Sequence, residues 1–188
     1  MLSNHAYREL LWPFTRLPAQ YVVVDTETTG LFDGDSAPGL VSIGLVEVNE
    51  SQLFSETEIR VRPWTKISRE AQDVHGISNE DANKFPELSE VWPELMQLIS
   101  GRLLVMHNAS YDWRVLVENS ARAGLRLPSI RGVFCTQKTA YPWAEAIGLP
   151  VSRRGPALDT LTQHLGIEDH RAELGFHGAL VDAKQTAH

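Results

Sequence analysis

Cysteine is nearly absent from this sequence, and the single residue of that type, Cys135, cannot form an intrachain disulfide. It lies in the apolar run 133–135, which indicates a buried hydrophobic side chain rather than a nucleophile. With 188 residues, of which 43% are hydrophobic, the chain can bury a core without covalent cross-links. The composition therefore predicts a globular domain that needs no oxidising compartment.

Long hydrophobic runs are absent as well. No stretch approaches the roughly 18 apolar residues of a membrane-spanning helix. Pro13 and Arg16 interrupt the apolar N-terminus, unlike a signal peptide. We therefore expect a soluble, cytoplasmic protein without a membrane partner. Residues 1–19 are expected to form an extension with one short helical turn at 6–12, and residues 20–188 a single domain.

Positive charge is also scarce, because 17 Lys and Arg face 24 Asp and Glu for a net charge of −7. Proteins that bind nucleic acid normally present a basic face to the phosphates. Carboxylates that hold divalent cations reverse this local charge and can attract a phosphate. The acidity therefore argues against tight non-specific duplex binding, but it does not exclude a metal-dependent nuclease.

Apolar periodicity and turn residues divide the chain into strands and helices. Strands are expected at 21–24, 40–48, 53–61 and 103–106, the second and third as antiparallel neighbours. Helices are expected at 68–74, 88–99, 111–123, 136–145, 157–165 and from about 178 to the end. Early strands followed by mixed strands and helices predict an α/β domain with a mixed central sheet.

Asp25 and Glu27 stand at the end of the first expected strand. Because a strand has a period of two, both carboxylates point to the same face and can hold one cation. Buried carboxylates are costly unless metal ions or hydrogen bonds compensate them. Two acids at a strand end also occur as ordinary loop residues, so the pair alone leaves both interpretations open.

Two later segments carry further candidates. Asp112 falls in the first turn of an expected helix, where the helix dipole alone also favours an acid. His177 and Asp182 cannot share one face of a helix at their spacing. We therefore expect His177 on the loop before the last helix and Asp182 on that helix. A histidine before a helix is also typical of a cap or a surface group.

Four motifs follow one another along the chain. They are Asp25-Thr26-Glu27-Thr28-Thr29-Gly30, Val74-His75-Gly76-Ile77, His107-Asn108-Ala109-Ser110-Tyr111-Asp112 and His177-Gly178-Ala179-Leu180-Val181-Asp182-Ala183. Together they closely resemble the DnaQ-like (DEDDh) 3′→5′ exonuclease family, which includes the proofreading epsilon subunit of bacterial DNA polymerase III. The resemblance covers about residues 21–188 and implies a ribonuclease H-like fold, with a mixed central sheet flanked by helices.

The resemblance also implies a site. It assigns Asp25, Glu27 and Asp182 to one divalent cation, with Asp25 bridging to a second that Asp112 helps to hold. His177 is implied as the general base, a role that suits an ordinary pKa near 6.5. Oxygen-rich ligands favour Mg²⁺ or Mn²⁺. Substrate contacts are implied for Thr28, Thr29, Val74, His75 and Asn108.

The implied enzyme hydrolyses phosphodiester bonds by a two-metal-ion mechanism. It acts from the 3′ end of single-stranded or frayed DNA, releases nucleoside 5′-monophosphates, and serves in proofreading or repair, with a DNA polymerase as a candidate partner. An RNA-trimming 3′→5′ exoribonuclease is the alternative within the same fold, and DNA is favoured only modestly by the motif at 74–77. An inactive binding module is a further alternative, against which the intact set of site residues argues.

Two features depart from the family or stand outside its motifs. Tyr111 occupies a position where relatives usually have Phe, and we expect its ring to keep the same packing role. Arg153 and Arg154 lie in an expected loop before residue 157. They could contact substrate phosphates, but a solvated charged loop is the favoured interpretation.

Overall fold

The computed structural model describes residues 16–167 and 177–188, so the helical turn expected at 6–12 lies outside the described residues. Five strands form one sheet in the order β3-β2-β1-β4-β5. Their bounds are β1 Gln20–Thr28, β2 Leu40–Asn49, β3 Gln52–Arg60, β4 Leu103–Met106 and β5 Gly132–Cys135. β1, β2 and β3 pair antiparallel, whereas β4 and β5 run parallel to β1. The sheet is mixed, which confirms the predicted fold class.

Seven helices are described. They are α2 Arg69–His75, α3 Asn79–Ala82, α4 Leu88–Ile99, α5 Ala109–Arg122, α6 Thr136–Ala146, α7 Leu158–Leu165 and α8 Ala179–Ala187. The expected helices correspond to α2 and α4–α8, with ends that differ by up to two residues. The sequence interpretation missed α3 and β5. α3 has four residues, too few to show helical periodicity, and β5 is a four-residue apolar segment without alternation.

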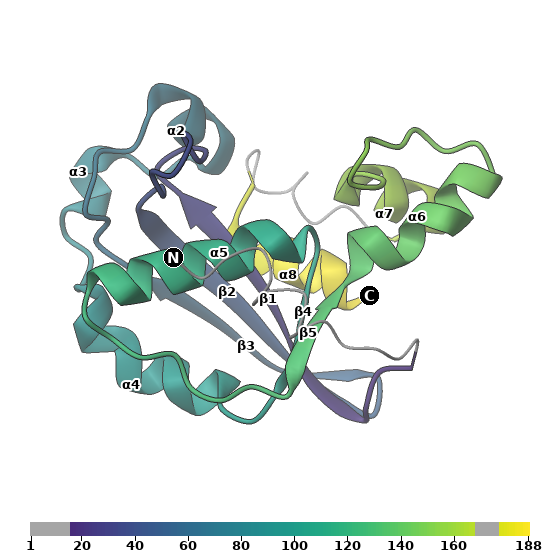
Figure 1. The fold of residues 1–188 in the computed structure, drawn as a ribbon, viewed down its shortest axis with the longest axis horizontal. Coiled ribbons are helices and arrows are strands. Elements are labelled where there is room, and N and C mark those ends of the chain that lie inside the picture. The colour runs from purple at the N-terminus through teal and green to yellow at the C-terminus, as the bar shows by residue number, and fades with distance from the viewer. Residues whose placement is uncertain (1–15, 168–176) are drawn as a thin grey trace.

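The core has two layers, one on each face of the sheet. α4 and α5 pack on one face, where Leu95, Ile99 and Leu116 are fully buried against β1 and β2 residues such as Val24. α8 covers the other face and contributes Ala183 to a smaller cluster. Figure 1 shows α5 and α8 on opposite sides of β1, and α6 and α7 as a pair beyond β5. β1 is therefore covered on both faces, which explains its run of buried valines.

The helix ends follow local chemistry. Ser68 caps α2 by accepting a hydrogen bond from the N–H of Ala71, and Gly76 ends the helix in the left-handed conformation. Glu87 and Glu90 form a capping box at the start of α4. None of the helices in the described residues has both the length and the apolar composition that crossing a membrane would require.

Candidate metal centre and nucleotide pocket

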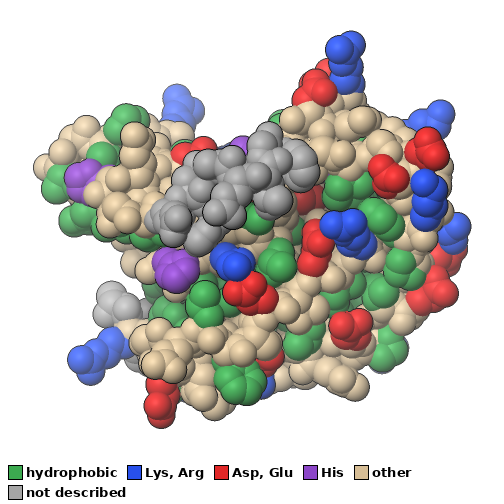
Figure 2. Space-filling view, turned by 180° about the vertical axis from the view of Figure 1, so that it is seen from behind, with side chains coloured by type: hydrophobic (Ala, Val, Ile, Leu, Met, Phe, Trp, Pro, Cys, Tyr) green, Lys and Arg blue, Asp and Glu red, His purple; other side chains and the backbone are tan. Residues whose placement is uncertain are grey.

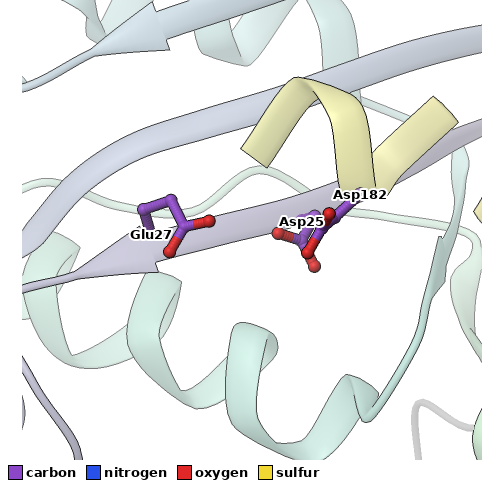
Figure 3. A group of neighbouring side chains, drawn as sticks. All are labelled: Asp25, Glu27 and Asp182. Atoms are coloured by element: carbon purple, nitrogen blue, oxygen red, sulfur yellow. The ribbon is translucent and has the colours of Figure 1, made fainter. Parts of the chain in front are cut away.

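Three carboxylates meet at the end of β1 on the face covered by α8. Asp25 and Glu27 come from the strand and Asp182 from the helix, and one oxygen of each lies within 4.8 Å of the others. Figure 3 shows Asp25 next to Asp182 where α8 packs on β1, with Glu27 farther along the strand. Glu27 and Asp182 are buried, with 9% and 8% exposure. Three like charges this close repel one another, and a divalent cation between them would relieve that repulsion.

Gly44 of β2 brings the third carboxylate into place. It pairs with Asp25 across the two strands, so it lies beside the site. A Cβ atom at Gly44 would overlap the backbone of Ala179 in the first turn of α8. The missing side chain therefore lets the helix lie directly on the strand, and Asp182 reaches Asp25. A glycine inside an expected strand is a recognised signal of such an approach, although the sequence interpretation did not use it.

Asp112 approaches the same strand from the opposite face. It lies in the first turn of α5 and is buried, with 4% exposure. Its Oδ1 accepts two hydrogen bonds from Thr26, one from the backbone N–H at 3.1 Å and one from the hydroxyl at 2.7 Å. The pairing of β1 with β4 ends at Val23, before Thr26. The backbone N–H of Thr26 therefore has no partner on β4 and donates to Asp112 instead. Asp112 is thus not a member of the three-carboxylate group.

Burial dominates the ionisation of Asp112. It raises the pKa of this carboxyl from 3.8 to about 7, and the nearby charge of Asp182 acts in the same direction. The hydrogen bonds from Thr26 act in the opposite direction but do not outweigh burial. Without a cation, Asp112 is therefore largely protonated below neutral pH. A cation nearby would favour the ionised form.

His177 immediately precedes α8, as the sequence predicted, with Gly178 as the N-cap of that helix. Its Nδ1 lies 3.4 Å from Oδ2 of Asp182, and 42% of the side chain is exposed. The backbone N–H of His177 donates to the carbonyl of Val74 at 2.9 Å. This bond joins the last motif to the end of α2, so the histidine is held beside both the carboxylates and the Val74 segment.

A pocket of about 590 Å³ opens at the end of β1. Its walls come from β1 and the following loop, from α2, from the start of α5, and from Arg154 on a distant loop. The lining residues include Glu27, Thr28, Leu31, Val74, His75, Asn108, Tyr111 and Arg154. Leu31 and Val74 are exposed apolar side chains, with 83% and 46% exposure. The volume and the mixture of apolar and polar walls suit a small organic group such as one nucleotide.

Four of the five predicted substrate-contact residues line this pocket, namely Thr28, Val74, His75 and Asn108. The fifth, Thr29, does not: it is 4% exposed, and its hydroxyl accepts a hydrogen bond from the N–H of Gly39. Thr29 therefore stabilises the loop that follows β1. Burial also lowers the pKa of His75, whose Nδ1 accepts from the N–H of Ile77 at 3.1 Å.

Tyr111 does more than pack its ring. It contacts Phe32 edge to face with ring centroids 5.4 Å apart, as the packing role requires. Its hydroxyl also donates to the carbonyl of Gly30 at 2.9 Å and lies 2.8 Å from the hydroxyl of Thr28. These bonds tie the first turn of α5 to the loop after β1. The polar role was missed, because a Tyr in place of Phe does not by itself indicate a partner.

His107 connects three segments of the chain through its two ring nitrogens. Its Nδ1 lies 2.9 Å from the hydroxyl of Thr136, and its Nε2 lies 3.1 Å from the carbonyl of Pro156. It therefore links the end of β4 to the start of α6 and to the loop before α7. Asn108 follows in the left-handed conformation, with φ of 56°, and begins α5. Asn tolerates this conformation better than most residues, which fits its place at a sharp strand-to-helix turn.

Over the residues that the structure describes, the face that carries α8 has no uniform basic patch. Figure 2 shows Lys and Arg interspersed with Asp and Glu over its described part. Positive charge at the site must then come from a few placed side chains or from bound cations, consistent with the net charge of −7.

Comparisons with known proteins agree with this geometry. An exonuclease family model, RNase_T, matches residues 22–188. DNA polymerase III subunit epsilon of Escherichia coli (strain K12) is 31% identical over 173 residues, which cover 88% of this chain and 68% of that protein. DNA polymerase III PolC-type of Thermotoga petrophila is 29% identical over 172 residues. The match covers 90% of this chain but only 11% of that polymerase.

Solved structures show the same fold. Exonuclease X in complex with 5′ overhanging duplex DNA is 26% identical with a TM-score of 0.63, covering 89% of this chain and 86% of that one. Cell-death related nuclease 4 has a TM-score of 0.73 at 15% identity, covering 90% of this chain and 61% of that one. At that identity the second likeness concerns the fold alone.

Proposed function

We propose that this chain, which belongs to the RNase_T exonuclease family and is of its DnaQ-like (DEDDh) type, is a metal-dependent 3′→5′ exonuclease. It removes nucleotides from the 3′ end of single-stranded or frayed DNA and releases nucleoside 5′-monophosphates. The observation that carries the proposal is the meeting of Asp25, Glu27 and Asp182 at the mouth of a nucleotide-sized pocket.

The donor set fits divalent cations. Asp25, Glu27 and Asp182 offer hard carboxylate oxygens within 4.8 Å of one another, a set that suits Mg²⁺ or Mn²⁺. Asp112 is buried with a pKa raised to about 7, so the hydrogen bonds from Thr26 compensate its ionised form only in part. We assign the first three residues to one cation and Asp25 with Asp112 to a second. When bound, these ions would supply Lewis-acid activation of water and charge neutralisation of the leaving 3′ oxygen.

His177 is assigned as the general base. When Nδ1 carries its proton toward Asp182, Nε2 is the nitrogen free to take a proton from the attacking water. The hydrogen bond from the backbone of His177 to Val74 keeps this ring beside the pocket wall. A histidine with 42% exposure can then return its proton to solvent after each turnover.

The pocket is assigned to the terminal nucleotide. Leu31 and Val74 offer apolar surface for a base, while Thr28 and Asn108 offer polar groups for a sugar or phosphate. DNA is preferred because the relatives are DNA polymerase subunits and because Exonuclease X was solved with DNA. The same relatives make a DNA polymerase the partner class to test, in proofreading or repair.

The test uses 5′-labelled single-stranded DNA, a frayed duplex and RNA of the same sequence. With Mg²⁺ or Mn²⁺ the protein should shorten DNA one nucleotide at a time, release nucleoside 5′-monophosphates, and stop when EDTA is added. Asp25→Asn should lower turnover by at least about 100-fold while the domain stays folded. Asp35→Asn, the same change at an exposed loop acid, should not.

The outcomes separate the alternatives. Faster removal from RNA than from DNA would assign the enzyme to RNA trimming. A protein that hydrolyses neither strand with either metal would be a binding module of the same fold, and the enzymatic proposal would be wrong.

A further inference from the structure

Two neighbouring arginines on one turn have different surroundings. The turn Ser152–Gly155 joins α6 to α7, and both Arg153 and Arg154 are exposed on it. Only Arg154 lines the pocket at the end of β1. The sequence favoured a solvated loop for both residues; both are exposed, and Arg154 in addition lines the pocket.

The turn is internally braced. Ser152 and Gly155 exchange backbone hydrogen bonds of 3.0 and 3.1 Å. The hydroxyl of Ser152 accepts from the N–H of Arg154 at 3.1 Å and lies 2.9 Å from the carbonyl of Gly155, to which it donates. Gly155 has φ of +126°, a conformation that L side chains rarely adopt. The direction in which Arg154 leaves the backbone is therefore well defined.

The turn is also anchored to the strand end that leads into the pocket. The carbonyl of Pro156 accepts a hydrogen bond from Nε2 of Gln137 at 3.1 Å and also lies 3.1 Å from Nε2 of His107. Gly155 lies against Gln137 so closely that a Cβ atom would clash with its backbone. His107 is followed directly by Asn108 of the pocket wall. The backbone position of Arg154 relative to the pocket is thus set before any substrate binds, which lowers the entropic cost of using this residue.

Charge gives Arg154 a function there. Among the described residues that line the pocket, three carry a charged side chain of the Asp, Glu, Lys or Arg type: Glu27, Glu70 and Arg154. Within the described part of the chain, Arg154 forms no ion pair with an acid. A DNA strand brings one negative charge per nucleotide to an entrance that is otherwise acidic. A guanidinium at that entrance can bind two phosphate oxygens at once.

We propose that Arg154 binds a phosphodiester group of the substrate strand adjacent to the scissile one, and thereby positions the 3′ end in the pocket. The inference rests on the proposed function and adds a residue that holds the strand by its backbone. It also explains how a protein with a net charge of −7 can retain a DNA end. Arg153, which does not line the pocket, contributes only a solvated charge.

Kinetics of three variants on the same turn test this. Arg154→Ala should lower kcat/KM on single-stranded DNA by about 10- to 100-fold, mainly through KM, because a hydrogen-bonded charged contact is lost. It should also flatten the dependence of log kcat/KM on log salt concentration by about 0.7, the slope of one phosphate contact on a single strand. Arg153→Ala should stay within about twofold of the wild type with an unchanged slope. Arg154→Lys should recover part of the loss, because Lys keeps the charge but not the two-pronged geometry.

Substrates with one neutral linkage locate the contact. Three substrates each carry one uncharged methylphosphonate, at the first, second or third linkage from the scissile one. Each of them therefore lacks a single phosphate charge. At one of these positions the wild type should lose the same factor that Arg154→Ala loses, and Arg154→Ala should lose nothing further. Equal kinetics for the two alanine variants, or equal losses in wild type and Arg154→Ala at every position, would overturn the proposal.

Failure of the proposed function gives a different result. If the wild type hydrolyses neither DNA nor RNA, the enzymatic assignment fails. Fluorescence anisotropy of a 5′-labelled oligothymidylate in Ca²⁺ then decides the role of Arg154 separately. Weaker binding by Arg154→Ala than by Arg153→Ala supports the contact, and equal binding refutes it.

Discussion

The two faces of β1 hold acids in opposite ways. On the face covered by α8, one oxygen each of Asp25, Glu27 and Asp182 lies within 4.8 Å of the others. On the face covered by α5, Thr26 reaches Asp112 with a backbone N–H and a hydroxyl. One strand therefore has a group of three like-charged side chains on one side and a single buried carboxyl that accepts hydrogen bonds from the strand on the other.

The acids on the two faces of β1 should respond to bound cations for different reasons. The cluster is destabilised by repulsion among its members, whereas Asp112 is destabilised by burial of its charge. Bound cations would relieve both, but protonation alone already relieves Asp112 at mildly acidic pH. Changes confined to one face should consequently have separate effects, which the following three predictions measure.

The largest effect is expected from Gly44→Ala, which disturbs only the α8 face. The added Cβ would overlap the backbone of Ala179 and displace the first turn of α8. Asp182 and His177 would move with it, and a displacement of about 1 Å can lower turnover by about 100-fold. Overpacking should also cost about 1–3 kcal/mol of unfolding free energy. Activity on single-stranded DNA and urea unfolding measure the two effects.

Ser42→Ala is the matched control for Gly44→Ala. Ser42 lies two residues earlier on the same face of β2, and its hydroxyl is buried without a hydrogen-bond partner among the described residues. Its loss should leave stability nearly unchanged. If Gly44→Ala behaved like Ser42→Ala in both measurements, close packing of α8 on β2 would not be what places Asp182.

An effect of opposite sign on stability is expected on the α5 face. The pKa of Asp112 is raised from 3.8 to about 7, so the folded state binds this proton more tightly than the unfolded state. Its contribution to stability is complete below about pH 4 and is lost as the pH rises through 7. Asp112→Asn should therefore stabilise the metal-free protein at pH 8 by about 1–3 kcal/mol, with little effect near pH 4. Thermal unfolding in EDTA at the two pH values measures this.

The control on the same helix is Glu118→Gln, whose carboxylate is half-exposed beside Arg114. It should change stability by less than about 0.5 kcal/mol at either pH. Added Mn²⁺ should stabilise the wild type more than Asp112→Asn. A destabilised Asp112→Asn at pH 8 would mean that the ionised carboxylate is favourable in the metal-free protein, and the contrast between the two faces would disappear.

The smallest effect is expected from Tyr111→Phe, which keeps the ring and removes the bridge to the loop after β1. Burial is the main cause that raises the pKa of Tyr111, so its hydroxyl stays protonated and donates to the carbonyl of Gly30. Its loss should cost about 0.5–1.5 kcal/mol and raise KM slightly, because the Thr28 hydroxyl keeps its own bond to that carbonyl. Tyr141→Phe makes the same change at an exposed hydroxyl and should cost less. Equal losses would assign Tyr111 to ring packing alone.

The sequence predicted the elements well where periodicity was long. The bounds of α4 agree with the expected range, because Leu88, Trp92, Leu95 and Ile99 repeat at helical spacing and all become buried. The four-residue elements α3 and β5 were missed because so short a segment carries no period. For the site, the sequence identified the carboxylates and His177 as candidates, but only the structure shows that Thr26 binds Asp112 on the other face of β1.

By itself, the sequence determined which residues are available and which pairs share a face. Asp25 and Glu27 point the same way because a strand alternates, whereas the five-residue spacing of His177 and Asp182 places them on different faces of a helix. Only the tertiary structure decided which distant segments meet. Gly44 allows α8 onto the sheet, the end of the β4 pairing leaves an N–H for Asp112, and the braced turn at 152–155 brings Arg154 to the pocket. Strand and helix periods follow from local backbone geometry, whereas these contacts depend on the packing of segments that are far apart in the chain.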